Sequence, residues 1–254
     1  MITLAFDTCL DKMYVALGDN DTIFDSKIVE TTKEHYHSAF LISAIKEILI
    51  KNNLTPKDIE VIATNIGPGS FTGIRACTTV ARVFAQSNNI KTAGVSSLEI
   101  LSRIRKQENK DAKTQRGKEA KEDENYASFH PGIFASENRS TLQPFNPSTL
   151  VALDARKEMA YVAIFEEDKQ FLEPQSMLIE DLKELIAKNN YFIVTDDKLE
   201  PILGGISYQK TNADLGKCLI EITNKKIEEN CETDWRKLHP LYIQPPAVMV
   251  KSEK

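Results

Sequence analysis

Residues 67–75 decide the fold, and they read Gly67-Pro68-Gly69-Ser70-Phe71-Thr72-Gly73-Ile74-Arg75. A largely apolar stretch, 59–66, leads into this run, and a segment with apolar residues at helical spacing, 71–86, follows it. Because glycine permits sharp turns and close backbone approach, the run predicts a tight loop between a buried strand and a helix. The first N–H groups of that helix favour an anion, or Ser70 caps them instead.

The loop matches neither common phosphate-binding pattern. A P-loop needs Gly-Lys-Ser/Thr at a fixed distance, and a dinucleotide fold needs GxGxxG. Residues 67–75 contain neither, so their composition alone does not decide between a nucleotide, an acidic partner and a plain turn.

Working outward, apolar periodicity predicts the same order of elements in both halves of the chain. The expected elements are strands at 2–7, 13–17 and 22–29, a helix at 37–51, a strand at 59–66, helices at 71–86 and 97–105 around a strand at 90–95, then strands at 150–154, 159–165 and 171–177, a helix at 179–188, a strand at 191–195 and a helix at 214–228. Strands that alternate with helices indicate an α/β protein whose mixed sheets are covered by helices.

A polar segment separates the two halves. Residues 105–148 are dense in charged residues, proline, serine and asparagine. Such a composition buries too little apolar surface to offset the entropy of ordering. We therefore expect a first lobe at 1–104, a flexible insert at 105–148 and a second lobe at 149–254. The insert is interpreted as solvated, the alternative being a contact arm for RNA or protein.

Composition restricts the class of protein. The net charge is −5, which opposes extensive contact with a nucleic-acid backbone. The four cysteines form no CxxC pair, which argues against a zinc site and against a disulfide framework. No apolar run is long enough to span a bilayer, and the N-terminus lacks the features of a secretory signal. A cytoplasmic protein without membrane contact is expected.

Residues 67–75 closely resemble the GPGSFTGLR signature of the TsaB family. Four weaker resemblances follow in the family's order: the first strand at 4–8, the segment at 94–99, the Asp-Ala-Arg turn at 153–156 and the Pro-x-Tyr ending at 240–243. Gln244 stands where the family often has arginine, which puts any anion contact of that arginine in doubt.

The resemblance implies an ASKHA-type fold of two ribonuclease-H-like lobes. It also implies a non-catalytic scaffold that works beside a TsaD-like catalytic subunit and a TsaE-like ATPase. Together such proteins transfer a threonylcarbamoyl group to the adenosine next to the anticodon of certain tRNAs. The scaffold would meet tRNA only indirectly and bring no cofactor of its own, with ATP or ADP at the shared interface of the complex.

The residues themselves favour the absence of catalysis and of a metal. His35 and His37 are two positions apart, so on a helix they cannot share an ion. Asp7 is interpreted as a turn cap, the alternative being a Mg²⁺ ligand through water. Cys9 and Cys77 are expected to be buried structural thiols, because no histidine is placed to activate them. Asp154 and Arg156 are expected to form an internal ion pair or to support a hairpin turn, the alternative being binding at the lobe junction. An ATP-binding phosphotransferase of the ASKHA fold stays open as the alternative function, and a peptidase is the least supported.

Two sets of residues are predicted to contact other molecules. The signature loop is assigned to nucleotide or partner contact: Gly67, Pro68, Gly69, Ser70, Phe71, Thr72, Gly73 and Arg75. The helices at 37–51 and 71–86 carry more apolar and small residues than one buried stripe needs, which predicts an interface with a TsaD-like subunit or with a second copy. Its residues are Leu41, Ile42, Ile45, Leu49, Gly73, Ala76, Cys77, Val80 and Ala81. The alternative is that both helices are simply buried on the sheet.

Overall fold

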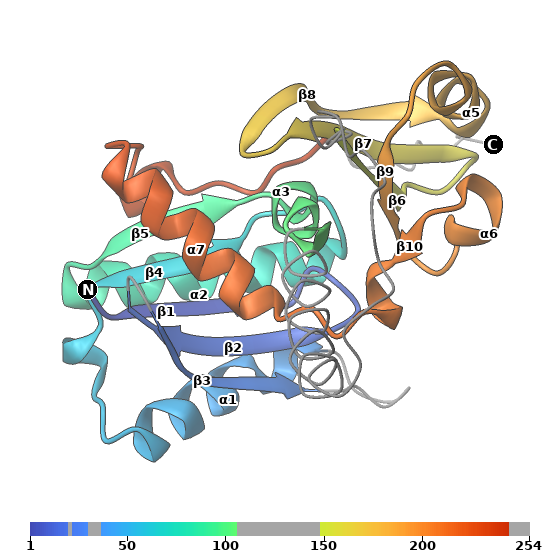
Figure 1. Ribbon diagram of the computed structural model, residues 1–254. Coiled ribbons are helices and arrows are strands. Elements are labelled where there is room, and N and C mark those ends of the chain that lie inside the picture. Colours follow the sequence, from blue (N-terminus) through green and yellow to red (C-terminus); the bar gives the residue numbers. More distant parts are fainter. Residues whose placement is uncertain (20–21, 30–36, 106–147, 244–254) are drawn as a thin grey trace, which may run out of the picture.

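The chain folds into two lobes, each built on a five-stranded sheet (Figure 1). The computed structural model describes residues 1–19, 22–29, 37–105 and 148–243. The predicted insert, apart from its two ends, and Gln244 lie outside these residues. Within the described part of the chain, no helix is both long and apolar enough to cross a membrane.

The first sheet has the order β3-β2-β1-β4-β5. Its strands are β1 (Thr3–Asp7), β2 (Met13–Gly18), β3 (Ile23–Val29), β4 (Val61–Asn65) and β5 (Lys91–Val95). The strands β1, β2 and β3 form an antiparallel meander, whereas β4 and β5 run parallel to β1. Strands β1, β2 and β4 are buried along their whole length because helices cover both faces of the sheet.

The second sheet repeats this plan with the order β10-β9-β6-β7-β8. Its strands are β6 (Thr149–Asp154), β7 (Met159–Glu166), β8 (Lys169–Leu178), β9 (Phe192–Thr195) and β10 (Ile206–Ser207). Here β6, β7 and β8 form the meander, and β9 and β10 add parallel strands. The same topology occurs twice, so the predicted fold of two ribonuclease-H-like lobes is confirmed.

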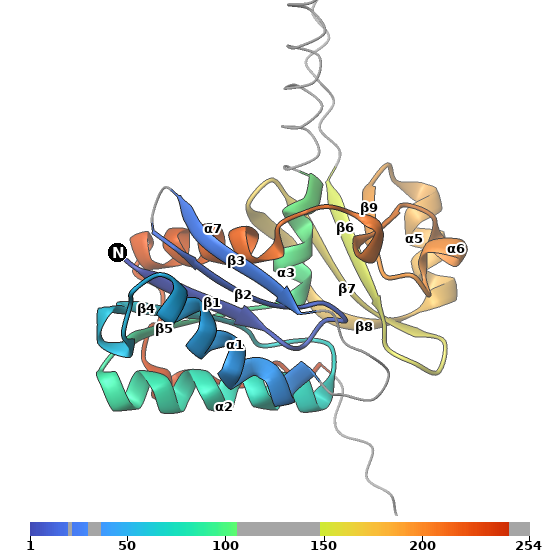
Figure 2. The ribbon, with the colours of Figure 1, turned by 90° about the horizontal axis from the view of Figure 1, so that it is seen from below.

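Helices cover the sheets on both sides. Beneath the first sheet, α1 (His37–Lys51) and α2 (Phe71–Asn88) lie side by side, and α7 (Leu215–Glu228) covers the opposite face (Figure 2). The short α3 (Ser97–Ser102) packs against β6, β7 and α7, and α5 (Ile179–Lys188) packs against β8. Sequence periodicity missed the shortest elements: α6 (Glu200–Leu203), β10 and the 3₁₀ turns η2 (Tyr208–Lys210) and η3 (Trp235–Lys237). A further 3₁₀ turn, η1 (Pro56–Asp58), follows the capping residue Thr55.

The domain boundary at residue 149 needs a correction, because α7 belongs to the first lobe. It packs across β1, β2, β4 and β5, although it follows the second sheet in sequence. The chain then continues along the first lobe, where the backbone N–H of Thr92 donates to Thr233 (2.9 Å) and that of Leu241 to Ile66 (2.8 Å). An apolar stripe on α7 covers the otherwise open face of the first sheet, and this burial determines its place.

As a result, one hydrophobic core is shared by both lobes. It joins Ala5 and Ala16 of the first sheet to Val151 and Ala163 of the second, through residues of α3 and α7. Two further cores belong to single lobes, one between the first sheet and the pair α1 and α2, the other between the second sheet and α5.

Candidate functional site

The signature loop connects β4 to α2 through two glycines with positive φ. Gly67 has φ 99° and Gly69 has φ 157°. A side chain at Gly67 would meet Ile74 at 2.7 Å, and one at Gly69 would meet the Cys9 carbonyl at 2.5 Å. The Ser70 hydroxyl accepts from the N–H of Gly73 (3.3 Å) and so caps α2. Of the two interpretations of this helix start, the structure supports the cap.

The loop also fixes α2 onto the turn between β1 and β2. The N–H of Ser70 donates to the Cys9 carbonyl (2.8 Å). A Cβ at Gly73 would lie only 1.9 Å from the Thr8 carbonyl oxygen. Two backbones therefore touch at Gly73, which explains why a glycine occupies the first turn of this helix.

Beneath the loop lies a buried polar centre around Asp7. One Asp7 oxygen accepts from the Asn65 amide (2.9 Å) and the other from the N–H of Cys9 (2.5 Å). The Asn65 side-chain oxygen in turn accepts from the N–H of Gly67 (2.8 Å) and from the Ser97 hydroxyl (2.9 Å). Burial raises the pKa of Asp7 to about 6, although the hydrogen bonds from Asn65 and Cys9 lower it. Asp7 thus caps the turn, as the sequence predicts.

Two thiols adjoin this centre. Cys9 and Cys77 are both buried, which agrees with their expected character. The N–H of Thr8 donates to Cys77 Sγ (3.1 Å), and the thiol of Cys9 donates to the Asn65 carbonyl (3.4 Å). Burial and the neighbouring Cys77 raise the pKa of Cys9 well above its usual value, so Cys9 is a poor nucleophile.

On the outer side of the loop, three side chains form what we call the aromatic–arginine cluster: Phe71, Arg75 and Tyr242. The Arg75 guanidinium lies over the Phe71 ring, 4.0 Å from its centre, and Arg75 Nε donates to the Tyr242 hydroxyl (3.2 Å). The two rings are 5.6 Å apart. Phe71 is 44% exposed and Tyr242 is 43% exposed, so the cluster presents aromatic and cationic surface to solvent.

The structure divides the predicted interface residues into two groups. Most of them form the core between the first sheet and α1 and α2, so their assignment to a surface is wrong. The buried residues are Leu41, Ile45, Leu49, Gly73, Cys77 and Ala81. Ile42 is exposed, and Ala76 and Val80 are half-buried. Apolar spacing predicted too wide an exposed stripe, because a helix that packs against both a sheet and a neighbouring helix buries residues on two sides.

The accessible apolar residues of α1 and α2 are fewer and partly different from those expected. Ile42 is 61% exposed and Val83 is 58% exposed, and Ile50 is similarly open. Ile42 and Ile50 lie two turns apart on α1, with Lys46 between them on the same stripe. Val83 was missed because most residues one helical turn away from it, Thr79, Gln86 and Ser87, are polar.

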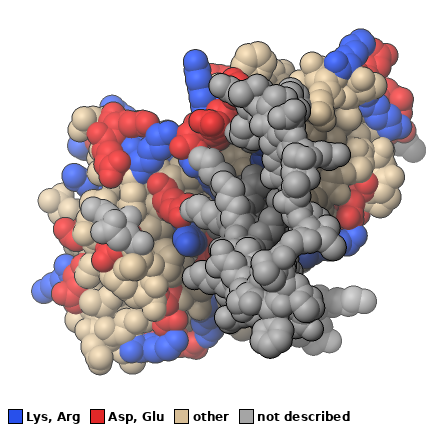
Figure 3. Space-filling view, viewed as in Figure 1, with Lys and Arg blue, Asp and Glu red and all other residues tan. Residues whose placement is uncertain are grey.

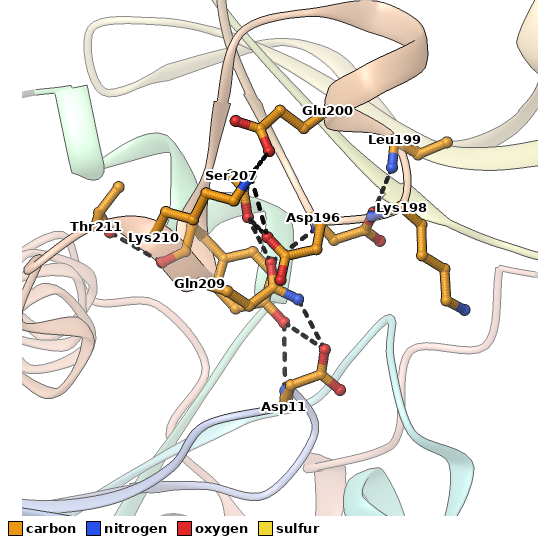
Figure 4. A network of polar contacts seen from close by, with 11 residues as sticks. Asp11, Asp196, Lys198, Leu199, Glu200, Ser207, Gln209, Lys210 and Thr211 are labelled. Atoms are coloured by element: carbon orange, nitrogen blue, oxygen red, sulfur yellow. Dashed lines mark hydrogen bonds and ion pairs between the residues drawn. The ribbon is translucent and has the colours of Figure 1, made fainter.

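A second group of polar residues joins the lobes (Figure 4). Asp11, from the turn between β1 and β2, accepts from Gln209 Nε2 (2.8 Å), and its N–H donates to the Tyr208 hydroxyl (3.3 Å). The Gln209 side-chain oxygen accepts from the Ser207 hydroxyl (2.8 Å) and from the N–H of Asp197 (3.0 Å). The first turn of one lobe is thereby tied to the end of the other sheet.

The predicted turn at 154–156 supports its own hairpin. Asp154 Oδ1 accepts from the N–H of Arg156 (3.0 Å), and Asp154 Oδ2 pairs with Lys198 Nζ (2.6 Å). Burial tends to raise the pKa of Asp154, but the hydrogen bond from Lys198 and the N–H of Arg156 outweigh it, so the pKa lies below its usual value. The ion-pair partner of Asp154 is therefore Lys198 rather than Arg156.

Comparison with known proteins identifies related sequences. The family model described as "TsaD: tRNA N6-adenosine threonylcarbamoyltransferase" matches residues 27–114. The chain is 35% identical to the tRNA threonylcarbamoyladenosine biosynthesis protein TsaB of Buchnera aphidicola subsp. Schizaphis graminum over 101 residues, 40% of this chain and 47% of that protein. It is also 35% identical to TsaB of Bacillus subtilis (strain 168) over 102 residues, 40% of this chain and 44% of that protein.

These matches support the TsaB family. Each alignment spans less than half the length of the curated TsaB protein it matches. At the level of fold, the agreement extends over both lobes. YeaZ from Pseudomonas aeruginosa superimposes with a TM-score of 0.64 at 15% identity, covering 95% of this chain and 99% of that chain. The two-lobed α/β architecture is thus that of YeaZ.

Proposed function

We propose that the chain is a non-catalytic scaffold subunit of the machinery that makes threonylcarbamoyladenosine in tRNA. Its partner in this proposal is a TsaD-like catalytic subunit, with a TsaE-like ATPase acting on the same complex. The names of the related proteins and the TsaD family match support the pathway. In the absence of the partner, the proposal expects a homodimer through the surface of α1 and α2 that would otherwise bind the partner.

The chemistry of the buried centre supports a role without catalysis. Both oxygens of Asp7 accept hydrogen bonds from the protein, and the carboxylate has no exposed surface. The start of α2 is capped by Ser70, which leaves less opportunity for a phosphate there. The proposal therefore assigns the chain no nucleotide of its own and places any ATP or ADP at the interface with the partner.

The observation that carries a scaffold role is the accessible apolar surface of α1 and α2. Ile42 and Val83 are more than half exposed, on the two helices that lie side by side under the first sheet (Figure 2). The aromatic–arginine cluster stands at the start of α2 and adds residue types that dominate the energy of many interfaces. Contiguous patches of exposed apolar residues mark contact surfaces, and the proposal takes these residues to form one.

Surface charge favours a protein partner over direct binding of tRNA. On the face shown in Figure 3, acidic and basic side chains are intermixed over the described residues, without a continuous basic patch among them. Together with the net charge of −5, this opposes an extended contact with phosphates. The proposal accordingly has tRNA bound by the catalytic subunit.

The test is co-purification of the full chain with the TsaD-like protein of the same cell. Ile42→Glu and Val83→Glu should each weaken co-elution and the reconstituted tRNA modification at least 10-fold, while circular dichroism stays unchanged. The matched control is Ile202→Glu, a 46% exposed apolar residue of the second lobe, which should bind normally.

Two outcomes would count against the proposal. If both first-lobe variants bind as the unchanged chain does, the partner surface lies elsewhere. If the isolated chain hydrolyses ATP and loses this activity in Asp7→Ala, the phosphotransferase alternative is preferred.

A further inference from the structure

Asp7, Cys9 and Cys77 bring three metal-ligating side chains together inside the first lobe. One carboxylate oxygen and the two sulfur atoms all lie within 4.8 Å of one another, and all three residues are buried. They come from the end of β1, from the turn that follows it and from the second turn of α2. Nothing in the function proposed above uses the two thiols.

We propose that these three residues form a structural zinc site. Zinc binds thiolate sulfur at ~2.3 Å and carboxylate oxygen at ~2.0–2.2 Å, so its tetrahedral ligands lie roughly 3.5–4 Å from one another. The observed limit of 4.8 Å is close to this spacing. The proposal requires the three side chains to rotate until their donors reach this spacing around one ion.

The surroundings of the donors are those that hold a metal ligand in place. The N–H of Thr8 donates to Cys77 Sγ (3.1 Å), and the Asn65 amide donates to Asp7 (2.9 Å). Asn65 is itself held by the N–H of Gly67 and the hydroxyl of Ser97. Hydrogen bonds of this kind orient the ligands of a metal and tune their basicity.

A fourth ligand is available from neutral oxygens at the same place. Thr8 Oγ1 lies 3.2 Å from Cys77 Sγ, and the Asn65 carbonyl oxygen lies 3.4 Å from Cys9 Sγ. Binding converts two thiols to thiolates and releases two protons, with no change of oxidation state. With two thiolates and one carboxylate around Zn²⁺, the net charge of the site is −1. The hydrogen bonds that the two thiols lose on binding are weak.

The site is structural because solvent does not reach it. Catalytic zinc keeps an open position for water or substrate, whereas structural zinc is enclosed by its ligands. A metal here would link the turn between β1 and β2 to α2. These are the two segments whose backbones already meet at Gly73, so the ion would brace the support of the signature loop.

The experiment uses the full chain with Cys231→Ser, which removes the exposed thiol. The protein is unfolded in denaturant in the presence of a chelator, freed of the chelator and refolded with one equivalent of Zn²⁺, or of Co²⁺ as a spectroscopic probe. One zinc per chain, thiolate-to-cobalt charge-transfer absorption and a higher melting temperature with Zn²⁺ are expected, because a ligand of the folded state stabilises it.

Variants separate this site from other binding. Cys9→Ser and Asp7→Asn should lower the Zn²⁺ affinity about 100-fold or more and abolish the rise in melting temperature. Cys218→Ser is the matched control, because Cys218 is a buried thiol outside the cluster and should leave zinc binding unchanged. Two variants at different ligands keep the test decisive if one of them fails to fold.

The proposal is overturned if the refolded reference chain holds no zinc, or if Cys9→Ser binds zinc as tightly as the reference. It is also overturned if two thiols are lost on purification and return with a reductant, because Cys9 and Cys77 would then form a disulfide instead.

Discussion

Asp7 and Asp154 occupy the same position in the two lobes, yet their surroundings shift their pKa values in opposite directions. Each ends the first strand of its sheet and precedes the first turn of the meander. Asp7 is fully buried among neutral donors, and its pKa is raised to about 6. Asp154 is partly exposed and paired with Lys198, and its pKa is lowered. The fold alone therefore does not determine the chemistry of this position.

The loops that follow the fourth strand of each lobe, β4 and β9, also differ between the lobes. In the first lobe, two glycines and a serine cap lead into the 18 residues of α2. In the second lobe, Asp196 accepts from the N–H groups of Lys198 and Leu199, and α6 has only four residues. The first lobe thus combines close backbone packing with a long helix that carries accessible apolar residues, whereas the corresponding loop of the second lobe leads into a single helical turn.

Among substitutions that test this contrast between the two loops, the largest loss of stability is expected at Gly73. Gly73→Ala would place a methyl group 1.9 Å from the Thr8 carbonyl, a contact between two backbones that no side-chain rotation relieves. We expect the free energy of unfolding to fall by more than about 3 kcal/mol in urea titrations.

Gly204→Ala in the second lobe is its matched control. Unlike Gly73, Gly204 has a positive φ (72°), and nothing lies within 4 Å of the added methyl group. A smaller loss, about 1–3 kcal/mol, is expected from the backbone conformation (φ 72°, ψ −163°), which residues with a side chain rarely adopt. Equal losses at the two glycines would contradict the contrast between the loops.

The next effect is the pH dependence that Asp7 contributes in the presence of a chelator. Its folded pKa of about 6 lies above its ordinary value of 3.8, so the folded chain binds more protons between these values. The stability that the folded state gains by holding this proton is fully present below the ordinary pKa of 3.8 and is lost as the pH rises through about 6. At 1.36 kcal/mol per pKa unit, the loss is on the order of 3 kcal/mol.

Urea unfolding of Asp7→Asn and of the unchanged chain at pH 4 and pH 7 measures this contribution. Relative to the unchanged chain, the asparagine variant should become more stable as the pH rises. A difference between the two proteins that does not change with pH would show that folding does not raise the pKa of Asp7.

The smallest effect is expected at Asp154. Its lowered pKa gives stability that is present above its unfolded pKa and lost as the pH falls through its folded pKa, the reverse of Asp7. Because Lys198 is mostly exposed, the pair should contribute less than about 1 kcal/mol. A double-mutant cycle with Asp154→Asn and Lys198→Ala measures it, and a coupling of several kcal/mol would contradict the assignment of a surface pair.

The sequence predicted the fold well because its signal is local. Strand alternation, helical periodicity and turn residues such as Ser70 report on their own neighbourhoods, and both sheets followed from them. Interface residues were harder, because Leu41 and Ile42 look alike in sequence and differ only in what packs against them. The convergence of Cys9 with Cys77, and the ties from Asp11 to the second lobe, depend on contacts between distant segments that no local pattern records.

The position of α7 on the first sheet sets the order in which this protein can be completed during synthesis. Ala5 and Ala16 stay uncovered until a helix made nearly two hundred positions later reaches them. A ribosome-bound first half is thus an unfinished lobe, exposed to chaperones and proteases, and contacts so distant along the chain slow the search for the native state. Neither half is an independent module. An evolutionary exchange of the first lobe for another would therefore have to include α7 as well as the strands and helices of residues 1–105.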